Sequence, residues 1–569
     1  MKTWRISYIF ITVCFAVFLS VLPVKALAYA APVSTVRIGL NYGSSALPSA
    51  NLQNVAGRGS GYEFGYYESN RIFIPLGAAT SHEKITMMRD KNMLYNAMEN
   101  KYEEGTEGAV VVGCFHIKLD TQYLTYAEAR SAADTFTSVN AFVRYSSGVF
   151  FVMAGAYISA EIAQAEAALL GIQQSYTIDS GTSFTVTVVQ TGTANILLEF
   201  DSGSSLSLAV RPLCSGGEVK PQTWFRYYKW YGDFQYSRLS GGDLTVVNFV
   251  NIEDYVKGVI PYEMNPSWPL EALKAQAVCA RTYVTANLNK HRNYGFDCCN
   301  TTDCQVYYGN NSATANSDAA VDSTAGSFLT YNGNLCNTFY HAADGGYTEN
   351  SENVWVEACG YLRAVEDIYE TAIADSIPDY YWTITYSGEE LSERLKSRGY
   401  SCSTIIAFDV IEYTAAGNVY KIRLTDSNGR SFTFTKGECR TLPAARSQRY
   451  TISSSNAKYD NMSLFVNSSN STLPQKFSLS YLLGSSGLSK YFPSGDSVYA
   501  ITGTGNIETV GEKNTVNPSN PTFVISGTGY GHNVGMSQRG AYAMAYNFNK
   551  TYAEILGFYF QGTSVVTSA

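Results

Sequence analysis

The chain has 569 residues, 45% of them hydrophobic, which is too long for one ordinary core and predicts two to four folded units. Its formal net charge of −8 gives no electrostatic attraction to nucleic acid, so we expect no nucleic-acid partner. Tyrosine is frequent, with 44 residues against 6 tryptophans. Most tyrosines are expected to fill sheet faces, and others would suit stacking on sugar rings.

The first thirty residues have the pattern of a secretory signal. Lys2 and Arg5 precede an apolar run from residue 6 to 24, and a small-residue site ends at Ala30. The pattern predicts an extracytoplasmic protein, with residues 1–30 either cleaved or kept as a membrane anchor. Since no later segment approaches a membrane span, only this segment is expected to contact the membrane.

Three stretches follow in the N-terminal half. Residues 31–104 predict a β-rich part, beginning with the alternating strand Val36–Gly43. Residues 105–174 read as strand, helix, two paired strands and helix, which is the start of a ferredoxin-like α/β sandwich. Residues 175–250 return to short apolar strands, and their aromatic run 224–232 is either a core strand or a platform for glycan.

One glutamate stands out in the middle of the chain. Residues 244–252 predict a strand that runs into a turn, and a helix with Ser267 as N-cap and Pro269 in its first turn follows. Glu263 lies between them among apolar neighbours, where loss of solvation favours the protonated form and suits a general acid. The alternative is a carboxylate that bonds backbone amides at the helix entry. The apolar helix face is expected to comprise Leu270, Leu273, Ala277, Ala280, Val284 and Leu288.

The residues from Gly258 to Tyr283 resemble the signature of the stage II sporulation protein D family, which includes amidase-enhancer proteins. Both the Gly-Val-x-Pro-x-Glu-Met turn and the following helix match at the diagnostic positions. Three further blocks of that family follow in order, at residues 299–309, 340–355 and 527–545. Residues 251–569 are therefore expected to form an α+β catalytic domain, interrupted by a polar insertion at about 453–521.

The resemblance implies a lytic transglycosylase that acts on peptidoglycan glycan strands lacking stem peptides. Such an enzyme cleaves the bond between N-acetylmuramic acid and N-acetylglucosamine without water and leaves 1,6-anhydro ends. One carboxyl group serves as acid and then as base, a role expected for Glu263. Glu271 is a second candidate, although its place in the first helical turn favours a capping or dipole role.

The matching blocks also suggest residues that bind glycan. On the helix, Lys274, Gln276 and Arg281 either contact substrate or form the salt bridges and solvated face usual for helix charges. His532 is expected either at the groove or in a structural hydrogen bond. The other candidates from the blocks are Gln305, Tyr307, Thr348, Glu349, Ser537 and Gln538.

A cluster near the predicted helix contains groups that bind zinc. His291, Cys298 and Cys304 supply imidazole and thiolate ligands, with Cys299 close by. Some family members carry zinc in this region, but here Asp303 stands where a histidine is common before the second cysteine. No cofactor is expected to be required, and a structural zinc or a disulfide are the two alternatives.

The N-terminal stretch also has a resemblance of its own. Phe150, Phe151 and Val152 with the following Gly155–Tyr157 resemble a sporulation-related repeat domain, which binds glycan stripped of stem peptides, and a generic interaction domain is the alternative. Apart from catalysis, the sequence allows a non-catalytic enhancer of a cell-wall amidase, or a purely structural wall-binding protein. Glycan strands, with an amidase or other wall-remodelling proteins, are thus the expected partners.

Overall fold

The computed structural model describes residues 33–214, 219–454 and 520–568, together with four short strands between residues 455 and 519. The predicted export segment and most of the predicted insertion lie outside the described residues. Within the described part, no helix has the length and apolar character needed to cross a membrane. The fold is mixed α+β and rich in strands, as predicted.

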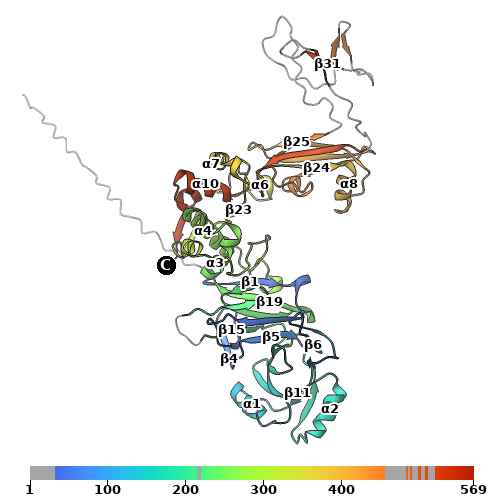
Figure 1. The fold of residues 1–569 in the computed structure, drawn as a ribbon, viewed down its shortest axis with the longest axis vertical. Helices are drawn as coiled ribbons and strands as arrows, with labels where there is room; N and C mark the ends of the chain where they lie inside the picture. Colours follow the sequence, from blue (N-terminus) through green and yellow to red (C-terminus); the bar gives the residue numbers. More distant parts are fainter. Residues whose placement is uncertain are drawn as a thin grey trace, which may run out of the picture.

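Two large sheets build the N-terminal half, at the blue and cyan end of Figure 1. A small three-stranded sheet of order β7-β6-β8 joins them, formed by β6 (Met93–Asn96), β7 (Lys101–Glu104) and β8 (Val111–Val112). The seven-stranded sheet has the order β20-β1-β19-β18-β15-β3-β4. Its strands are β1 (Thr35–Asn41), β3 (Tyr62–Tyr67), β4 (Phe73–Thr80), β15 (Leu208–Pro212), β18 (Asp233–Arg238), β19 (Leu244–Asn251) and β20 (Cys298–Cys299). Alternate residues of both sheets, such as Ile85 and Val246, are buried in one shared core, because successive side chains of a strand point to opposite faces.

The ten-stranded sheet has the order β12-β9-β11-β10-β14-β13-β5-β2-β16-β17. Its strands are β2 (Ser49–Asn54), β5 (Lys84–Arg89), β9 (Phe115–Leu119), β10 (Ala141–Ser146), β11 (Val149–Tyr157), β12 (Tyr176–Asp179), β13 (Val186–Gln190), β14 (Ile196–Asp201), β16 (Thr223–Phe225) and β17 (Tyr228–Trp230). Helices α1 (Tyr126–Ala133) and α2 (Ala160–Leu169) interrupt β9 to β12, giving β-α-β-β-α-β with antiparallel neighbours. This is the split β-α-β order, and β10 joins it to the larger sheet by pairing parallel with β14.

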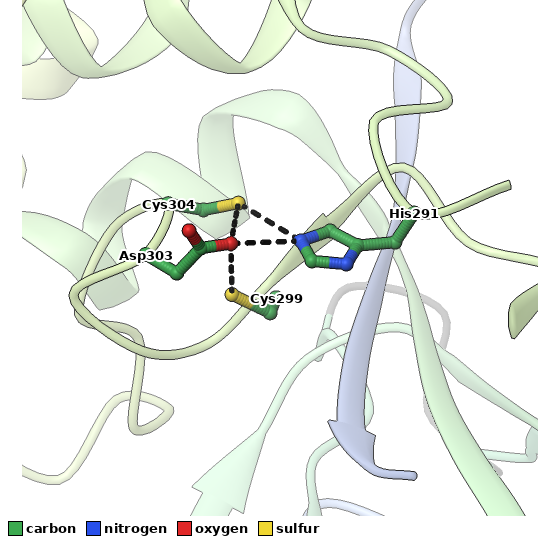
Figure 2. A group of neighbouring side chains, drawn as sticks. All are labelled: His291, Cys299, Asp303 and Cys304. Carbon is green, nitrogen blue, oxygen red and sulfur yellow. Dashed lines mark hydrogen bonds and ion pairs between the residues drawn. The ribbon is translucent and has the colours of Figure 1, made fainter. Parts of the chain in front are cut away.

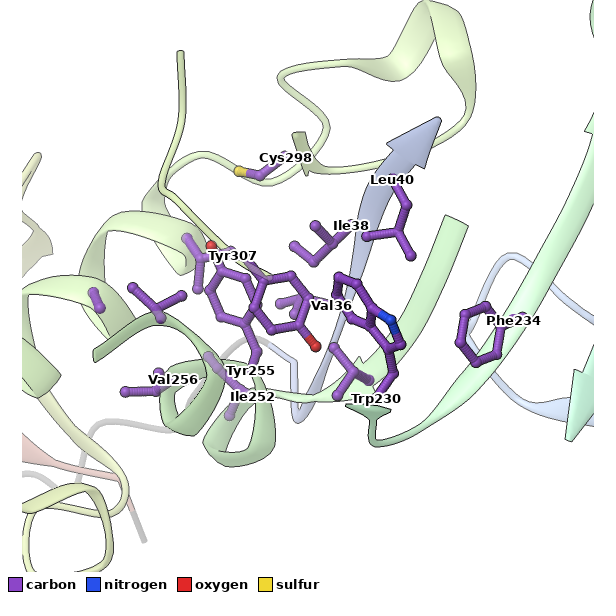
Figure 3. Packing of buried hydrophobic residues seen from close by; sticks show 14 of the residues in the cluster. Val36, Ile38, Leu40, Trp230, Phe234, Ile252, Tyr255, Val256, Cys298 and Tyr307 are labelled. Atoms are coloured by element: carbon purple, nitrogen blue, oxygen red, sulfur yellow. The ribbon is translucent and has the colours of Figure 1, made fainter. Parts of the chain in front are cut away.

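Two helices carry the chain from β19 into the central part of the molecule. They are α3 (Ile252–Glu263) and α4 (Leu270–Ala286), and they pack against each other and on β1 and α5 (Ala315–Asp322). Figure 3 shows Val36, Ile38 and Leu40, every second residue of β1, in the same core as Tyr255 and Tyr307. Because α4 is buried on nearly all sides, its position is fixed by packing.

The central part is completed by short elements around α4. They are β21 (Ser327–Tyr331), β22 (Asn334–Leu335), β23 (Tyr340–His341), β34 (Met536–Ser537), β35 (Ser564–Thr567), α6 (Ser351–Val354), α7 (Ile368–Thr371), α10 (Gln538–Phe548) and α11 (Tyr552–Tyr559). The two-residue strands β23 and β34 pair in parallel, which places Gln538 at the start of α10 close to β23.

A second lobe, at the end of Figure 1 away from the N-terminal sheets, has its own core around Leu391, Ile422 and Phe523. It holds β24 (Tyr381–Ser387), β25 (Ile405–Tyr413), β26 (Val419–Asp426), β27 (Ser431–Thr435), β28 (Tyr450–Ser454), β33 (Thr522–Thr528), α8 (Gly388–Lys396) and α9 (Glu438–Thr441). Strand β33 leads the chain back from this lobe to α10.

Candidate active site

A cavity of about 740 Å³ opens where the central helices meet the second lobe. Its walls come from segments far apart in the sequence, including Glu263, Tyr340, Trp355, Arg440, His532 and Gln538. Of the predicted glycan-binding residues, His532 and Gln538 line this cleft together with Glu263.

Glu263 is the last residue of α3, so the predicted strand-to-turn setting was wrong. The chain turns helical at once after β19 because Asn251 caps the first turn, accepting a hydrogen bond from the Glu253 amide. Pro261 cannot donate a backbone hydrogen bond, and the helix ends two residues later. The predicted cap of the next helix was also wrong: Ser267 bonds to Asn265 instead, and Pro269 occupies the N-cap position of α4.

The Glu263 carboxylate receives hydrogen bonds from three different segments. The Val306 amide donates to Oε1 at 2.9 Å, and the Gln538 amide donates to Oε2 at 3.5 Å. The Tyr340 hydroxyl is the third donor. Burial raises the pKa of Glu263, although these three hydrogen bonds act in the opposite direction. The C-terminal end of a helix also disfavours a negative charge. Burial and the helix end therefore favour the protonated form of Glu263, while the three donors stabilise its carboxylate.

Gln305 connects Tyr255 to Tyr340, the residue whose hydroxyl donates to Glu263. Its side chain is buried, accepts a hydrogen bond from Tyr255 at 2.9 Å and donates one to the Tyr340 hydroxyl at 3.1 Å. Because the donated bond occupies a lone pair of the Tyr340 oxygen, the Tyr340 proton is free to point to Glu263. Gln305 therefore positions Tyr340 and does not itself line the cleft.

His532 also lines the cleft and lies beside aromatic rings. Its ring centroid lies 5.1 Å from that of Trp355 and 6.3 Å from that of Phe339. The Val534 amide donates to Nδ1 at 3.2 Å, and burial lowers the pKa of His532 to about 4. At neutral pH the ring is therefore uncharged, and this wall offers sugar rings an aromatic surface.

Three predicted glycan-binding residues of α4 lie outside the cleft. Arg281 is fully buried and forms a bidentate ion pair with Glu253. Its Nε donates to Oε1 at 2.9 Å, and its Nη2 donates to Oε2 at 2.6 Å. Gln276 is also fully buried, and neither atom of its amide has a hydrogen-bond partner among the described residues. Lys274 pairs with Glu271 at 2.7 Å. Glu271 in turn accepts a hydrogen bond from the Tyr552 amide, which ties α4 to α11.

Four more predicted residues make structural contacts instead. The Tyr307 hydroxyl donates to Asn248, and its ring packs where a side chain at Gly258 would collide with it. Thr348 bonds to the Arg363 carbonyl. Glu349 is buried and joins the central part to the second lobe through Thr414 and Asn418. Ser537 caps α10, and its hydroxyl donates a hydrogen bond to Glu370.

Figure 2 shows a group of four side chains, two of which, Asp303 and Cys304, also line the cleft. The ligand atoms of His291, Cys299, Asp303 and Cys304 all lie within 4.8 Å of one another. His291 Nε2 is 3.3 Å from both Cys304 Sγ and Asp303 Oδ2, and Asp303 Oδ2 is 3.9 Å from each thiol. Cys298, which the sequence suggested, is outside this group and donates to the Asn287 carbonyl. All ten cysteines of the described part are free thiols.

Sequence reasoning assigned no role to several residues of the cleft, namely Lys290, Phe339, Tyr340, Trp355, Arg440 and Tyr530. Tyr340 and Trp355 are the first and last residues of the motif block 340–355. Their place in this block was the sequence signal that could have indicated a role in the site. Arg440 belongs to the second lobe, and no local pattern indicates that this lobe closes one side of the cleft.

Comparison with known proteins gives matches that include the Glu263 segment. A family model described as stage II sporulation protein matches residues 240–331. An uncharacterized protein of Brachyspira hyodysenteriae is 32% identical over 326 residues, covering 57% of this chain and 68% of that protein. An amidase enhancer of Bacillus subtilis is 32% identical over 324 residues, covering 55% of this chain and 40% of the enhancer.

A shorter match has the same level of identity. Stage II sporulation protein D of Bacillus subtilis is 32% identical over 164 residues, covering 26% of this chain and 47% of that protein. The chain thus spans less than half the length of the amidase enhancer and of stage II sporulation protein D of Bacillus subtilis.

Proposed function

Because the chain belongs to the stage II sporulation protein D and amidase-enhancer family, we propose that its cleft cleaves peptidoglycan glycan strands as a lytic transglycosylase. The substrate is glycan without stem peptides. The observation that carries the proposal is the single half-buried carboxyl group of Glu263, with a raised pKa and three hydrogen-bond donors around it.

In the proposed reaction the protonated Glu263 gives its proton to the oxygen that links N-acetylmuramic acid to N-acetylglucosamine. The bond from C1 to that oxygen breaks, and the O6 hydroxyl of the same muramic acid attacks C1. The Glu263 carboxylate, stabilised meanwhile by Val306, Tyr340 and Gln538, takes the O6 proton. A 1,6-anhydro ring forms, no water is consumed, and Glu263 returns to its acid form.

Of the two carboxylates that line the cleft, Glu263 and Asp303, only Glu263 is suited to act on the glycosidic bond. Asp303 also lines the cavity, but its Oδ2 oxygen lies 3.2 Å from Lys290 Nζ and 3.3 Å from His291 Nε2. A hydrolase needs two carboxylates about 5–9.5 Å apart, one of them as nucleophile or as base for water. Because Asp303 is paired with Lys290 and His291, it is poorly suited to act as a nucleophile or as a base for water. This favours the mechanism that uses one carboxylate.

The pH dependence of the reaction gives a test of the hydrogen bond from Tyr340. In Tyr340→Phe the carboxylate loses a donor, so the pKa of Glu263 rises further. Since the acid form starts the reaction, activity is lost as pH rises through this pKa, and we expect the alkaline limb of the rate profile to move to higher pH. Tyr530→Phe, at the cleft mouth, is the matched control and should leave the limb in place. A limb that stays or moves to lower pH in Tyr340→Phe would contradict the assignment.

We also propose that His291, Cys299, Asp303 and Cys304 hold a structural zinc ion. The donor types suit zinc. Four of the six separations between the ligand atoms are 3.3–3.9 Å, close to the roughly 3.3–3.8 Å edges of a tetrahedral zinc site, and all six are within 4.8 Å. The ion would fix the loop 299–309, which carries the Val306 amide that donates to Glu263.

Zinc content measured by mass spectrometry of the purified protein tests this site. We expect about one zinc per chain, lost in Cys299→Ser and Cys304→Ser because zinc needs its thiolate ligands. Cys298→Ser is the matched control, since that thiol lies outside the group, and it should retain the metal. Equal zinc loss in Cys298→Ser and Cys299→Ser, or a disulfide between Cys299 and Cys304, would overturn the proposal.

The proposal also includes the location of the protein and a second glycan-binding region. The protein acts outside the cytoplasm, delivered or anchored by residues 1–30, and residues 105–174 bind glycan as a sporulation-related repeat does. Support for the second point is the split β-α-β order of that stretch.

A second candidate function is enhancement of a cell-wall amidase, favoured by the 32% identity to the amidase enhancer. Purified protein and peptide-free glycan strands separate the two functions. Release of anhydro-ended fragments by the protein alone supports the transglycosylase. Binding without any product, combined with a faster amidase, supports the enhancer.

A further inference from the structure

Arg440 stands where the cleft meets a second cavity of about 580 Å³. Arg440 and Tyr530 line both cavities, and Asp379 and Arg446 lie only on the wall of the second. A ligand that fills the cleft beside Glu263 and extends toward the second lobe must therefore pass the Arg440 guanidinium.

Arg440 has no counterion within the described part of the chain, because no carboxylate there lies within ion-pair distance of it. The other cations of these two cavities are paired: Lys290 with Asp303 at 3.2 Å, and Arg446 with Asp379 at 3.1 Å. Arg440 is half buried, and this burial lowers its pKa.

The surroundings of Arg440 contain uncharged groups instead. Burial lowers the pKa of both His532 and His341, and the positive charge of Arg440 acts in the same direction. Tyr530, a phenol, is its other neighbour. A charged group that loses water without gaining a partner costs free energy. Such a cost is expected where an anionic ligand completes the site.

We propose that Arg440 binds the free lactyl carboxylate of an N-acetylmuramic acid residue in the cleft. This inference rests on the glycan-cleaving function proposed above and adds a reason for the preference for peptide-free strands. A guanidinium matches a carboxylate with two parallel hydrogen bonds. In a strand that carries stem peptides the same carboxyl group is an amide, which has no charge, and the peptide would have to fit past Arg440.

Binding measurements on the full chain test the inference. Glu263→Gln prevents turnover and serves as the parent protein. The probes are peptide-free glycan oligosaccharides and the same oligosaccharides with their lactyl carboxylates converted to methylamides. We expect the parent to prefer the free carboxylates, and Arg440→Gln to lose about 10- to 100-fold in affinity for them, as for a hydrogen bond between charged groups. The affinity of the variant for the methylamides should stay near that of the parent.

Arg446→Gln is the matched control, because its charge is already neutralised by Asp379. Arg440→Lys keeps the charge and should regain part of the preference. Equal losses in Arg440→Gln and Arg446→Gln, or an unchanged preference in Arg440→Gln, would overturn the inference. Thermal melting identifies a variant that fails to fold. If the active protein shows the preference but yields no cleavage product, Arg440 keeps this role and the transglycosylase proposal fails separately.

Discussion

Replacing Glu263 by Gln is expected to lower the rate of glycan cleavage by about 10²–10⁴-fold, the usual contribution of a general acid–base group. The amide keeps the size of the side chain and its acceptor for the Val306 amide, which binds the carboxylate at 2.9 Å. It supplies no acidic proton to the glycosidic oxygen and cannot accept the O6 proton. Release of soluble fragments from peptide-free glycan, followed by chromatography, measures the rate.

Glu271→Gln is the control for this experiment. Glu271 lies eight positions further along the chain, but its oxygens are held by Lys274 and by the Tyr552 amide, away from the cleft. We expect this variant to cleave at a rate close to that of the unmodified protein. A comparable loss in both variants, or a Glu263→Gln protein that still cleaves, would remove Glu263 from its role.

Replacing Arg281 by Met is expected to destabilise the central part by about 3–5 kcal/mol, as when one partner of a buried ion pair is removed. The guanidinium is fully buried, and its loss leaves Glu253 without its cation and the Ser327 carbonyl without a donor. Because Glu253 is in the first turn of α3, the loosened helix also carries Glu263 at its other end.

Urea unfolding followed by tryptophan fluorescence measures this effect. Arg423→Met is the matched control, since its ion pair with Asp409 is 3.6 Å long and half exposed on both sides. We expect the control to change the free energy of unfolding by at most about 1 kcal/mol. If Arg281→Met were as mild as the control, Arg281 would not be the structural residue described here.

The central helix α4 was predictable because its signal is local. Leu273, Ala277, Ala280 and Val284 are all fully buried, as the periodicity of α4 predicted. Leu270 is instead 37% exposed, and the helix ends at Ala286, before Leu288. The end of a helix depends on how its last turn packs, which a periodic pattern does not specify.

Helix α3 was missed because its sequence disfavours a helix over its second half. Gly258 and Pro261 are poor helix formers, and Val259 and Ile260 are typical of strands. Tertiary packing decides the outcome: Val256, Val259 and Ile260 are fully buried in the shared core, and Gly258 leaves room for the Tyr307 ring. Burial outweighs the weak preference of each residue.

The surroundings of Glu263 depend on contacts between segments distant in the chain. Gln538 is 275 residues from Glu263, and tertiary contacts such as the pairing of β23 with β34 bring it near. Cys298 and Cys299 show a related limit. Neighbouring residues in a strand face opposite sides, and the sequence alone does not say which one faces His291.

The most direct test of the proposed mechanism is cleavage of peptide-free glycan in water enriched in oxygen-18, with mass spectrometry of the new muramyl ends. We predict 1,6-anhydro ends without oxygen-18, because the O6 hydroxyl of the same sugar closes the ring and no water enters. New reducing ends that carry one oxygen-18 would contradict the mechanism. They would indicate a hydrolase, with Asp303 as the first residue to examine as its second carboxylate.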